Sequence, residues 1–166
     1  MTIRYRIDRI TPETLPLLFQ SLKNLAADLN DDFTTRETEL HAALFGPSPT
    51  CNALLALQDA RVLGAALFSP VFSTVRGGAG AYVSDLWIAP EARGQALGTA
   101  LLAAVAERSR SDWNASFIKL VSYSDNNEAL RFYARLGFAS LRGETGLTLS
   151  GAPLAALSRQ TQKDPQ

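Results

Sequence analysis

The chain has 166 residues, enough for one domain with a substantial core, and its 16 Lys and Arg residues balance 16 Asp and Glu residues. This balance gives no support for a nucleic-acid or anionic-membrane partner, and no apolar run approaches the roughly 18 residues that a membrane span needs. The first ten residues lack the apolar core of a signal peptide, and one cysteine with one histidine can form neither an internal disulfide nor a structural zinc site. We therefore expect a cytoplasmic protein without a metal, with one domain over residues 1–158 and a polar tail over 159–166.

The hydrophobic pattern predicts strands and helices that alternate along the chain. Strands are expected over residues 3–8, 52–58, 62–72, 81–89, 117–123, 138–141 and 147–149. Helices are expected over about 12–29, 35–45, 96–110, 127–136 and 153–157. A run of strands followed by β-α-β-α-β indicates an α/β (α+β) protein, with a mixed sheet and helices on both faces.

The segment between the strand at 81–89 and the next helix is rich in small residues. A phosphate can approach the backbone closely at such positions, and the unpaired N–H groups of the first helical turn attract an anion. We predict a pyrophosphate-binding loop made of Arg93, Gly94, Gln95, Ala96, Leu97, Gly98 and Thr99. The alternative is a tight turn that needs glycine only for backbone reasons. Neither the dinucleotide-binding pattern nor the nucleoside-triphosphate P-loop fits this spacing.

Asn126 and Tyr133 lie two helical turns apart, so they share one face of the helix predicted over 127–136. A tyrosine there can donate its phenolic proton to a leaving thiolate. The alternatives are an aromatic residue of the core and a plain N-cap.

The two segments together resemble the signatures of the GNAT acetyltransferase superfamily. The phosphate signature [RQ]-x-x-G-x-[GA] is matched by Arg93 and Gly98, with Ala96 in place of the first glycine. The preceding D-L-x-[VI]-x-P is matched by Asp85, Leu86, Ile88 and Pro90. The second signature, N-x-x-A-x-x-F-Y-x-x-x-G-F, is matched by Asn126, Ala129, Phe132, Tyr133, Gly137 and Phe138.

This resemblance implies a mostly antiparallel sheet of about seven strands, splayed at its middle. It implies direct transfer of an acetyl group from acetyl-CoA to an amine, without an acyl-enzyme, and Tyr133 as the acid. The residues expected to bind acetyl-CoA are the loop residues 93–99, Leu86, Trp87 and Ile88 on the strand, and Asn126, Ala129, Phe132 and Tyr133.

Residues 73–86 are similar to the diamine and polyamine acetyltransferase-like branch, which allows a homodimer. Ser84 replaces the glutamate that is the branch's candidate base and cation anchor.

The base therefore has several candidates. Asp85 is the nearest carboxylate, a water held by Tyr82 and Ser84 is the alternative, and Asp31 or Asp32 comes third. Regular alternation places Tyr82 and Ser84 on the face opposite Asp85, unless a bulge intervenes.

The acceptor stays open between a small-molecule amine and a protein amine. Asp31, Asp32 and Tyr82 are expected to attract a cationic amine, although the acidic pair is also typical of a solvated loop. We interpret Cys51 and His41 as structural residues. The departures at Ala96 and Ser84 motivate an alternative class of function, a non-catalytic CoA-binding or regulatory module on the same fold, against which the retained Tyr133 argues.

Overall fold

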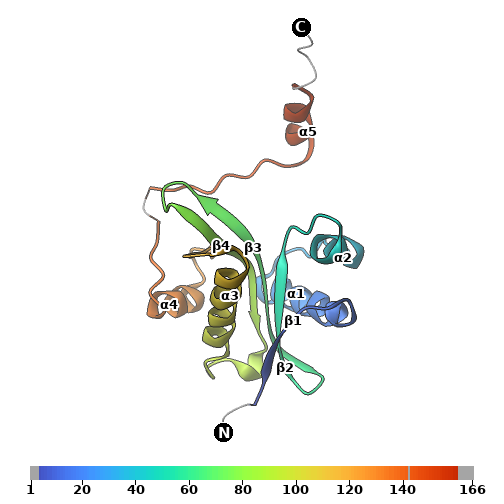
Figure 1. The fold of residues 1–166 in the computed structure, drawn as a ribbon, viewed down its shortest axis with the longest axis vertical. Helices are drawn as coiled ribbons and strands as arrows, with labels where there is room; N and C mark the ends of the chain where they lie inside the picture. The colour runs from blue at the N-terminus through green and yellow to red at the C-terminus, as the bar shows by residue number, and fades with distance from the viewer. Residues whose placement is uncertain (1–3, 142, 161–166) are drawn as a thin grey trace. The chain divides into compact units, whose positions relative to one another are not determined.

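The computed structural model describes residues 4–141 and 143–160, which divide into two compact units after Asn127 (Figure 1). The first unit contains β1 (Arg6–Arg9), η1 (Pro12–Thr14), α1 (Leu15–Leu29), α2 (Glu37–Phe45), β2 (Asn52–Gln58), β3 (Arg61–Ser73), β4 (Gly78–Ile88), η2 (Pro90–Ala92), α3 (Leu97–Trp113) and β5 (Ile118–Leu120). The other helices are α4 (Asn127–Arg135), which begins where the units divide, and α5 (Gly151–Gln160). The prediction of one domain over 1–158 stays a prediction.

The strands form one mixed sheet in the order β1-β2-β3-β4-β5. The first four strands are antiparallel neighbours, and β5 runs parallel to β4. The mixed, mostly antiparallel sheet is therefore confirmed. The number of about seven strands is wrong for the described residues, which contain five.

The two missing strands are those expected over 138–141 and 147–149. Their alternating pattern satisfies the sequence rule for a strand, but a strand also needs a partner for its backbone groups, and a short hairpin alone is marginal. The pattern suggested that the apolar side chain of Leu147 lies on a buried strand face, but this side chain is 91% exposed in the structure.

Helices cover both faces of the sheet, as expected. Every residue of β2 from Ala53 to Leu57 is buried, which requires cover on two sides. On one side, leucines of α1 and α2 pack with Leu55 and Ala65. On the other side lies α3, because a Cβ added to Gly64 of β3 would lie 2.8 Å from Leu101 of that helix (Figure 1).

The pairing of β4 and β5 is short. Only Ala81, Tyr82 and Val83 of β4 face β5, whereas β4 continues to Ile88 beside β3. Within the described residues, β4 from Ser84 to Ile88 thus has a strand partner along one edge only. Among the described residues, the other edge of this part of β4 has no strand partner, and the predicted splay of the sheet stays a prediction.

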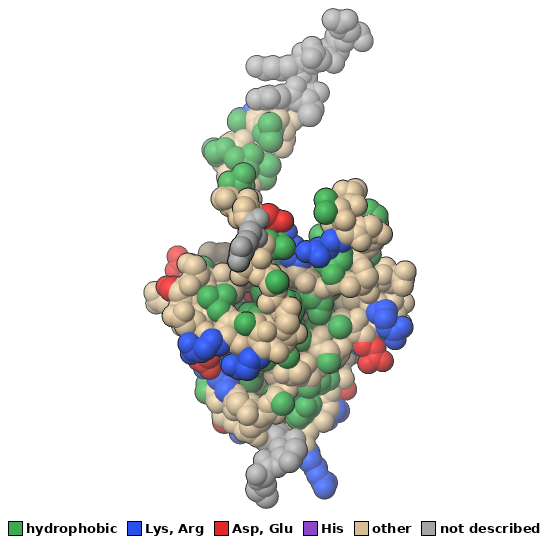
Figure 2. Space-filling model, turned by 90° about the vertical axis from the view of Figure 1, so that its left-hand side faces the viewer, with side chains coloured by type: hydrophobic (Ala, Val, Ile, Leu, Met, Phe, Trp, Pro, Cys, Tyr) green, Lys and Arg blue, Asp and Glu red, His purple; other side chains and the backbone are tan. Residues whose placement is uncertain are grey.

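Gly137 ends α4 with a φ of 91°, which confirms its predicted role at the helix C-terminus. The last predicted helix is longer than the five residues expected and includes residues 159–160 of the predicted tail, whose remainder lies outside the described residues. Its Leu154 and Leu157 are 45% and 52% exposed, and apolar side chains show on the surface of this segment (Figure 2).

Candidate active site

The loop that follows β4 is built on two residues in the left-handed region of backbone conformation. Gly94 has a φ of 74° and Ala96 a φ of 61°. Glycine adopts this conformation without cost, whereas alanine does not, because its Cβ crowds the neighbouring carbonyl. The two turns lead the chain from η2 into α3 and leave Gly94, Gln95 and Ala96 exposed.

The N-terminus of α3 is open. The first hydrogen bond inside the helix joins the Ala100 N–H to the Ala96 carbonyl at 3.0 Å, so the amides of Leu97, Gly98 and Thr99 have no acceptor within the helix. No side chain caps this end. Unpaired donors at the positive end of the helix dipole suit an anion, so the loop fits the pyrophosphate predicted for it.

Arg93, expected as a cation at the mouth of this loop, is already engaged. Its Nη2 lies 2.6 Å from Oδ2 of Asp28, and its Nε donates to the carbonyl of Ile88 at 3.1 Å. The indole Nε1 of Trp87 also donates to Oδ2 of Asp28, at 3.3 Å. The sequence interpretation missed Asp28, although an acidic residue in the last turn of a helix is a signal, because the dipole disfavours it there.

A bulge in β4 sets the directions of the candidate catalytic side chains. Leu67 pairs with Asp85 and Phe68 pairs with Val83, so Ser84 is the extra residue. A bulge thus interrupts the regular alternation that would have placed Asp85 on the face opposite Tyr82. Beyond the bulge, each side chain lies on the face of the sheet opposite to the one that regular alternation from Tyr82 would give it.

Directly opposed residues of an antiparallel pair share a face. Tyr82 is opposite Ser69, Asp85 is opposite Leu67 and Trp87 is opposite Ala65. Leu67 and Ala65 belong to the cluster that packs under α1 and α2. Tyr82, Asp85 and Trp87 thus lie on the same face as α1, whereas Leu86 and Ile88 lie on the α3 face.

Burial raises the pKa of Asp85, and a hydrogen bond with Ser84 opposes this shift. The hydroxyl of Ser84 also donates to the carbonyl of Leu67 at 3.3 Å. Burial raises the pKa of Cys51 as well, and the charge of Asp85 adds to that effect. A thiol with a raised pKa is a poor nucleophile, which agrees with the interpretation of Cys51 as a structural residue.

A further polar contact joins the segment after β5 to the segment after α1. The hydroxyl of Tyr123, which follows β5, lies 2.8 Å and 3.0 Å from the two carboxylate oxygens of Asp31, which follows α1. This hydrogen bond is the main cause that raises the pKa of Tyr123. The structure therefore holds Asp31 in place, while Asp32 is simply exposed. Tyr123 was not predicted, since no motif contains it.

The remaining predicted residues follow β5. Asn126 is half-buried at the end of the first unit, and its N–H donates to the Tyr123 carbonyl at 3.1 Å. In the second unit, Ala129, Phe132 and Tyr133 are half-buried residues of α4. The Tyr133 ring contacts Phe132 and Phe138 with ring centroids 5.2 Å and 5.5 Å apart, and burial raises its pKa.

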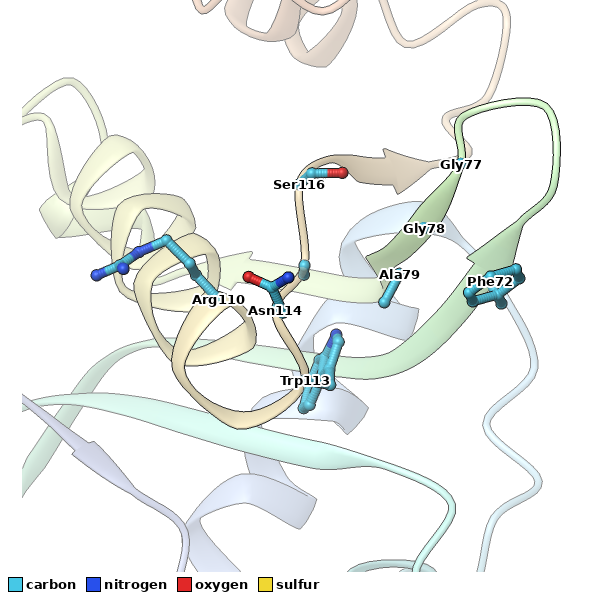
Figure 3. Close-up of a pocket in the computed structure, with 9 residues that line it drawn as sticks. Phe72, Gly77, Gly78, Ala79, Arg110, Trp113, Asn114 and Ser116 are labelled. Carbon is cyan, nitrogen blue, oxygen red and sulfur yellow. The ribbon is translucent and has the colours of Figure 1, made fainter.

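A cavity of about 620 Å³ lies at the other end of α3, between Phe72 and Ala79 of the β3–β4 hairpin and the turn around Trp113 and Asn114 (Figure 3). A helix of 17 residues is about 25 Å long, so this cavity is remote from the phosphate loop. It contains none of the predicted site residues.

Residues 4–141 and 143–160 contain no group of three His, Cys, Asp or Glu side chains able to hold a metal ion. No described helix has the length and apolarity that crossing a membrane requires.

The architecture is an α/β fold that several solved structures share. Solved structures that share the fold include an integron cassette protein from V. cholerae (TM-score 0.76, 22% identity, 95% of this chain and 99% of that one). Another is an aminoglycoside acetyltransferase from an uncultured soil metagenomic sample in complex with sisomicin (TM-score 0.72, 17% identity, 88% and 97%).

Residues 22–138 match the acetyltransferase (GNAT) family. The chain is also 30% identical over 126 residues to the thialysine N-epsilon-acetyltransferase of Bos taurus, covering 71% of this chain and 73% of that protein. The corresponding protein of Mus musculus is 30% identical over 118 residues, covering 66% and 68%. The chain therefore belongs to the GNAT acetyltransferase family, as its two signatures indicated.

Proposed function

We propose that this protein transfers an acetyl group from acetyl-CoA to a primary amine of a small cationic molecule, by direct attack within a ternary complex. The observation that carries the proposal is the open N-terminus of α3, which follows a strand that bears a half-buried carboxylate, Asp85, of raised pKa. One continuous segment, from Asp85 to Thr99, thus combines an acid–base group with an anion site.

Binding of acetyl-CoA is assigned to the loop residues 93–99 and to the free edge of β4 from Leu86 to Ile88. The first-turn amides of α3 suit the pyrophosphate, and unpaired backbone groups of β4 suit the amide-rich pantetheine arm. Asn126, Ala129 and Phe132 complete the proposed binding residues. Acetyl-CoA supplies an activated thioester, and the chain supplies binding, orientation and proton transfer.

Asp85 is the proposed base. An alkyl ammonium with a pKa near ~10.4 must lose a proton before it can attack. A carboxylate whose pKa lies above the ordinary aspartate value is a better proton acceptor near neutral pH. Tyr82 lies on the same face and can orient a water molecule, which preserves the alternative of a base acting through water with Ser84. Tyr133 is the proposed acid for the thiolate, because a phenol is protonated at neutral pH and burial raises the pKa of this one further.

Recognition of the acceptor is assigned to Asp31, Asp32 and Tyr82. Carboxylates at the end of α1 attract an ammonium group, and Tyr123 fixes one of them. Relatives named for thialysine support a small-molecule amine.

The deciding experiment measures CoA release from acetyl-CoA across a panel of amines. The panel contains thialysine, lysine, a diamine, an aminoglycoside and a peptide with a free N-terminus. Release with a small amine, and not with the peptide, supports the proposal. Tight acetyl-CoA binding without release for any amine refutes it and favours a non-catalytic CoA-binding module. A homodimer remains a prediction, which sedimentation of the same sample tests.

A further inference from the structure

The C-terminal end of α1 is unusually acidic. Asp28 occupies its last turn, Asp31 and Asp32 follow, and no basic residue lies in that turn. A helix C-terminus carries a partial negative charge, so a carboxylate there is unfavourable unless another group compensates it. A residue placed against its local preference is a candidate for a functional role.

The compensating groups of Asp28 come from β4 and the phosphate loop. Its Oδ2 accepts hydrogen bonds from Trp87 Nε1 and Arg93 Nη2. The side chains of Arg93 and Asp28 are 45% and 39% exposed. Ion pairs this exposed contribute little to folding stability. The contact therefore matters more for where it holds Arg93 than for how much it stabilises the protein.

Arg93 is fixed at two points. Asp28 holds Nη2 at 2.6 Å, and the carbonyl of Ile88 accepts from Nε at 3.1 Å. A guanidinium is planar with its donors in a rigid fork, so two anchors determine the plane of the group. Its third nitrogen, Nη1, has no protein partner among the described residues and stays available to an anion beside the loop.

We propose that Asp28 is a positioning residue for acetyl-CoA, which acts by holding Arg93 beside the pyrophosphate site. The inference rests on the proposed function, because it requires that the loop binds acetyl-CoA. Without Asp28, the long Arg93 side chain is ordered only on binding, and that ordering weakens affinity by roughly 3- to 10-fold.

A double-mutant cycle tests the inference on the full-length protein. Calorimetry measures the Kd for acetyl-CoA of the wild type, Asp28→Asn, Arg93→Gln and the double variant. Asp28→Asn is expected to raise the Kd by roughly 3- to 10-fold, and to change nothing further when Arg93 is already replaced. In kinetics, the KM for acetyl-CoA rises, while kcat and the KM for the amine stay constant.

The control is Asp8→Asn, which removes the carboxylate of another exposed ion pair, with Arg6 on β1. It should leave the Kd unchanged. Additive effects of the Asp28 and Arg93 changes, or an unchanged or tighter Kd in Asp28→Asn, overturn the inference.

Two other outcomes are also decisive. If the wild type itself does not bind acetyl-CoA, the proposed function fails, whereas wild-type binding with an unaffected Asp28→Asn refutes only the positioning role. If Asp28→Asn does not fold, Asp28→Glu takes its place in the cycle. The longer glutamate side chain of this variant shifts Arg93. The inference requires that Asp28→Glu raises the Kd for acetyl-CoA when Arg93 is present and has no effect when Arg93 is already replaced.

Discussion

Replacing Ala96 with glycine tests the strained turn on which the phosphate loop depends. Ala96 has φ 61° and ψ 7°, a left-handed conformation just before α3. Alanine in this region costs roughly 1–2 kcal/mol, whereas a new glycine costs roughly 0.5–1 kcal/mol in unfolded-state entropy. The difference predicts that Ala96→Gly raises the free energy of unfolding by about 0.7 kcal/mol, within a range of about 0–1.5 kcal/mol.

The assay is thermal unfolding followed by circular dichroism, with acetyl-CoA binding measured by calorimetry. For a chain of this length, about 0.7 kcal/mol corresponds to a rise in Tm of about 1–3 °C. Affinity for acetyl-CoA should stay equal or increase, because the change removes a methyl group from an exposed loop and lets the backbone keep its conformation.

The control is Ala100→Gly, the same chemical change four residues later within α3. At a helical φ, glycine costs about 0.8–1 kcal/mol, so this variant should melt lower than the wild type. The two substitutions therefore have opposite expected signs. If Ala96→Gly loses as much stability as Ala100→Gly, the loop does not contain the left-handed turn, and the argument for its exposed geometry fails.

The remaining predictions concern proton transfer and packing. Tyr133→Phe should leave the Kd for acetyl-CoA unchanged and lower kcat roughly 10- to 1000-fold, and unaltered turnover would exclude Tyr133 as the acid. Asp85→Asn should abolish the acidic limb of the rate–pH profile, whereas a retained limb would assign the base elsewhere. Burial raises the pKa of Asp85, so ionising this carboxyl group in the folded state is unfavourable. The stability of the wild type relative to Asp85→Asn is therefore highest below the ordinary pKa of about 3.9, and it declines as the pH rises through the raised pKa. Thermal melts of both proteins from pH 3.5 to 8 measure this difference. Gly64→Ala places a Cβ 2.8 Å from Leu101 and should lower the free energy of unfolding by about 1–3 kcal/mol, measured by denaturant unfolding. The control Gly78→Ala, whose Cβ would have no atom within 4 Å, should be nearly neutral. Equal stabilities of the two variants would contradict the packing of α3 on β3.

The sequence by itself determined most of the elements and the family. Helical and strand periodicities depend on local burial patterns, so the strand over 52–58 was predicted with the bounds the structure shows. The helix predicted over about 12–29 ends where α1 ends but begins earlier than α1 does. The open N-terminus of α3 was equally predictable, because small residues before a helix produce it through local geometry alone, whereas its role in binding phosphate stays a prediction. The second signature also names residues within one short segment, from Asn126 to Phe138, and the family match includes all of it.

The predictions that failed needed partners distant in the chain. Residues 138–141 and 147–149 have the pattern of a strand, but pairing depends on a neighbouring edge that the pattern does not contain. The bulge at Ser84 arises from the register between β3 and β4, and it brings Asp85 to the same face as Tyr82. Only tertiary structure decides such a register, because a shift of one residue reverses every side chain beyond it.

The polar contacts around the site were equally hidden. Asp28 meets Arg93 across 65 positions, and Tyr123 meets Asp31 across 92 positions. The local sequence marks Asp28 as unfavourably placed at a helix end, but it does not show which partner each side chain meets, since these hydrogen bonds exist only after α1 packs on the sheet. The sequence therefore determined which family and which loop, whereas the tertiary structure decided which charges meet there, because hydrogen bonds depend on distances that folding alone creates.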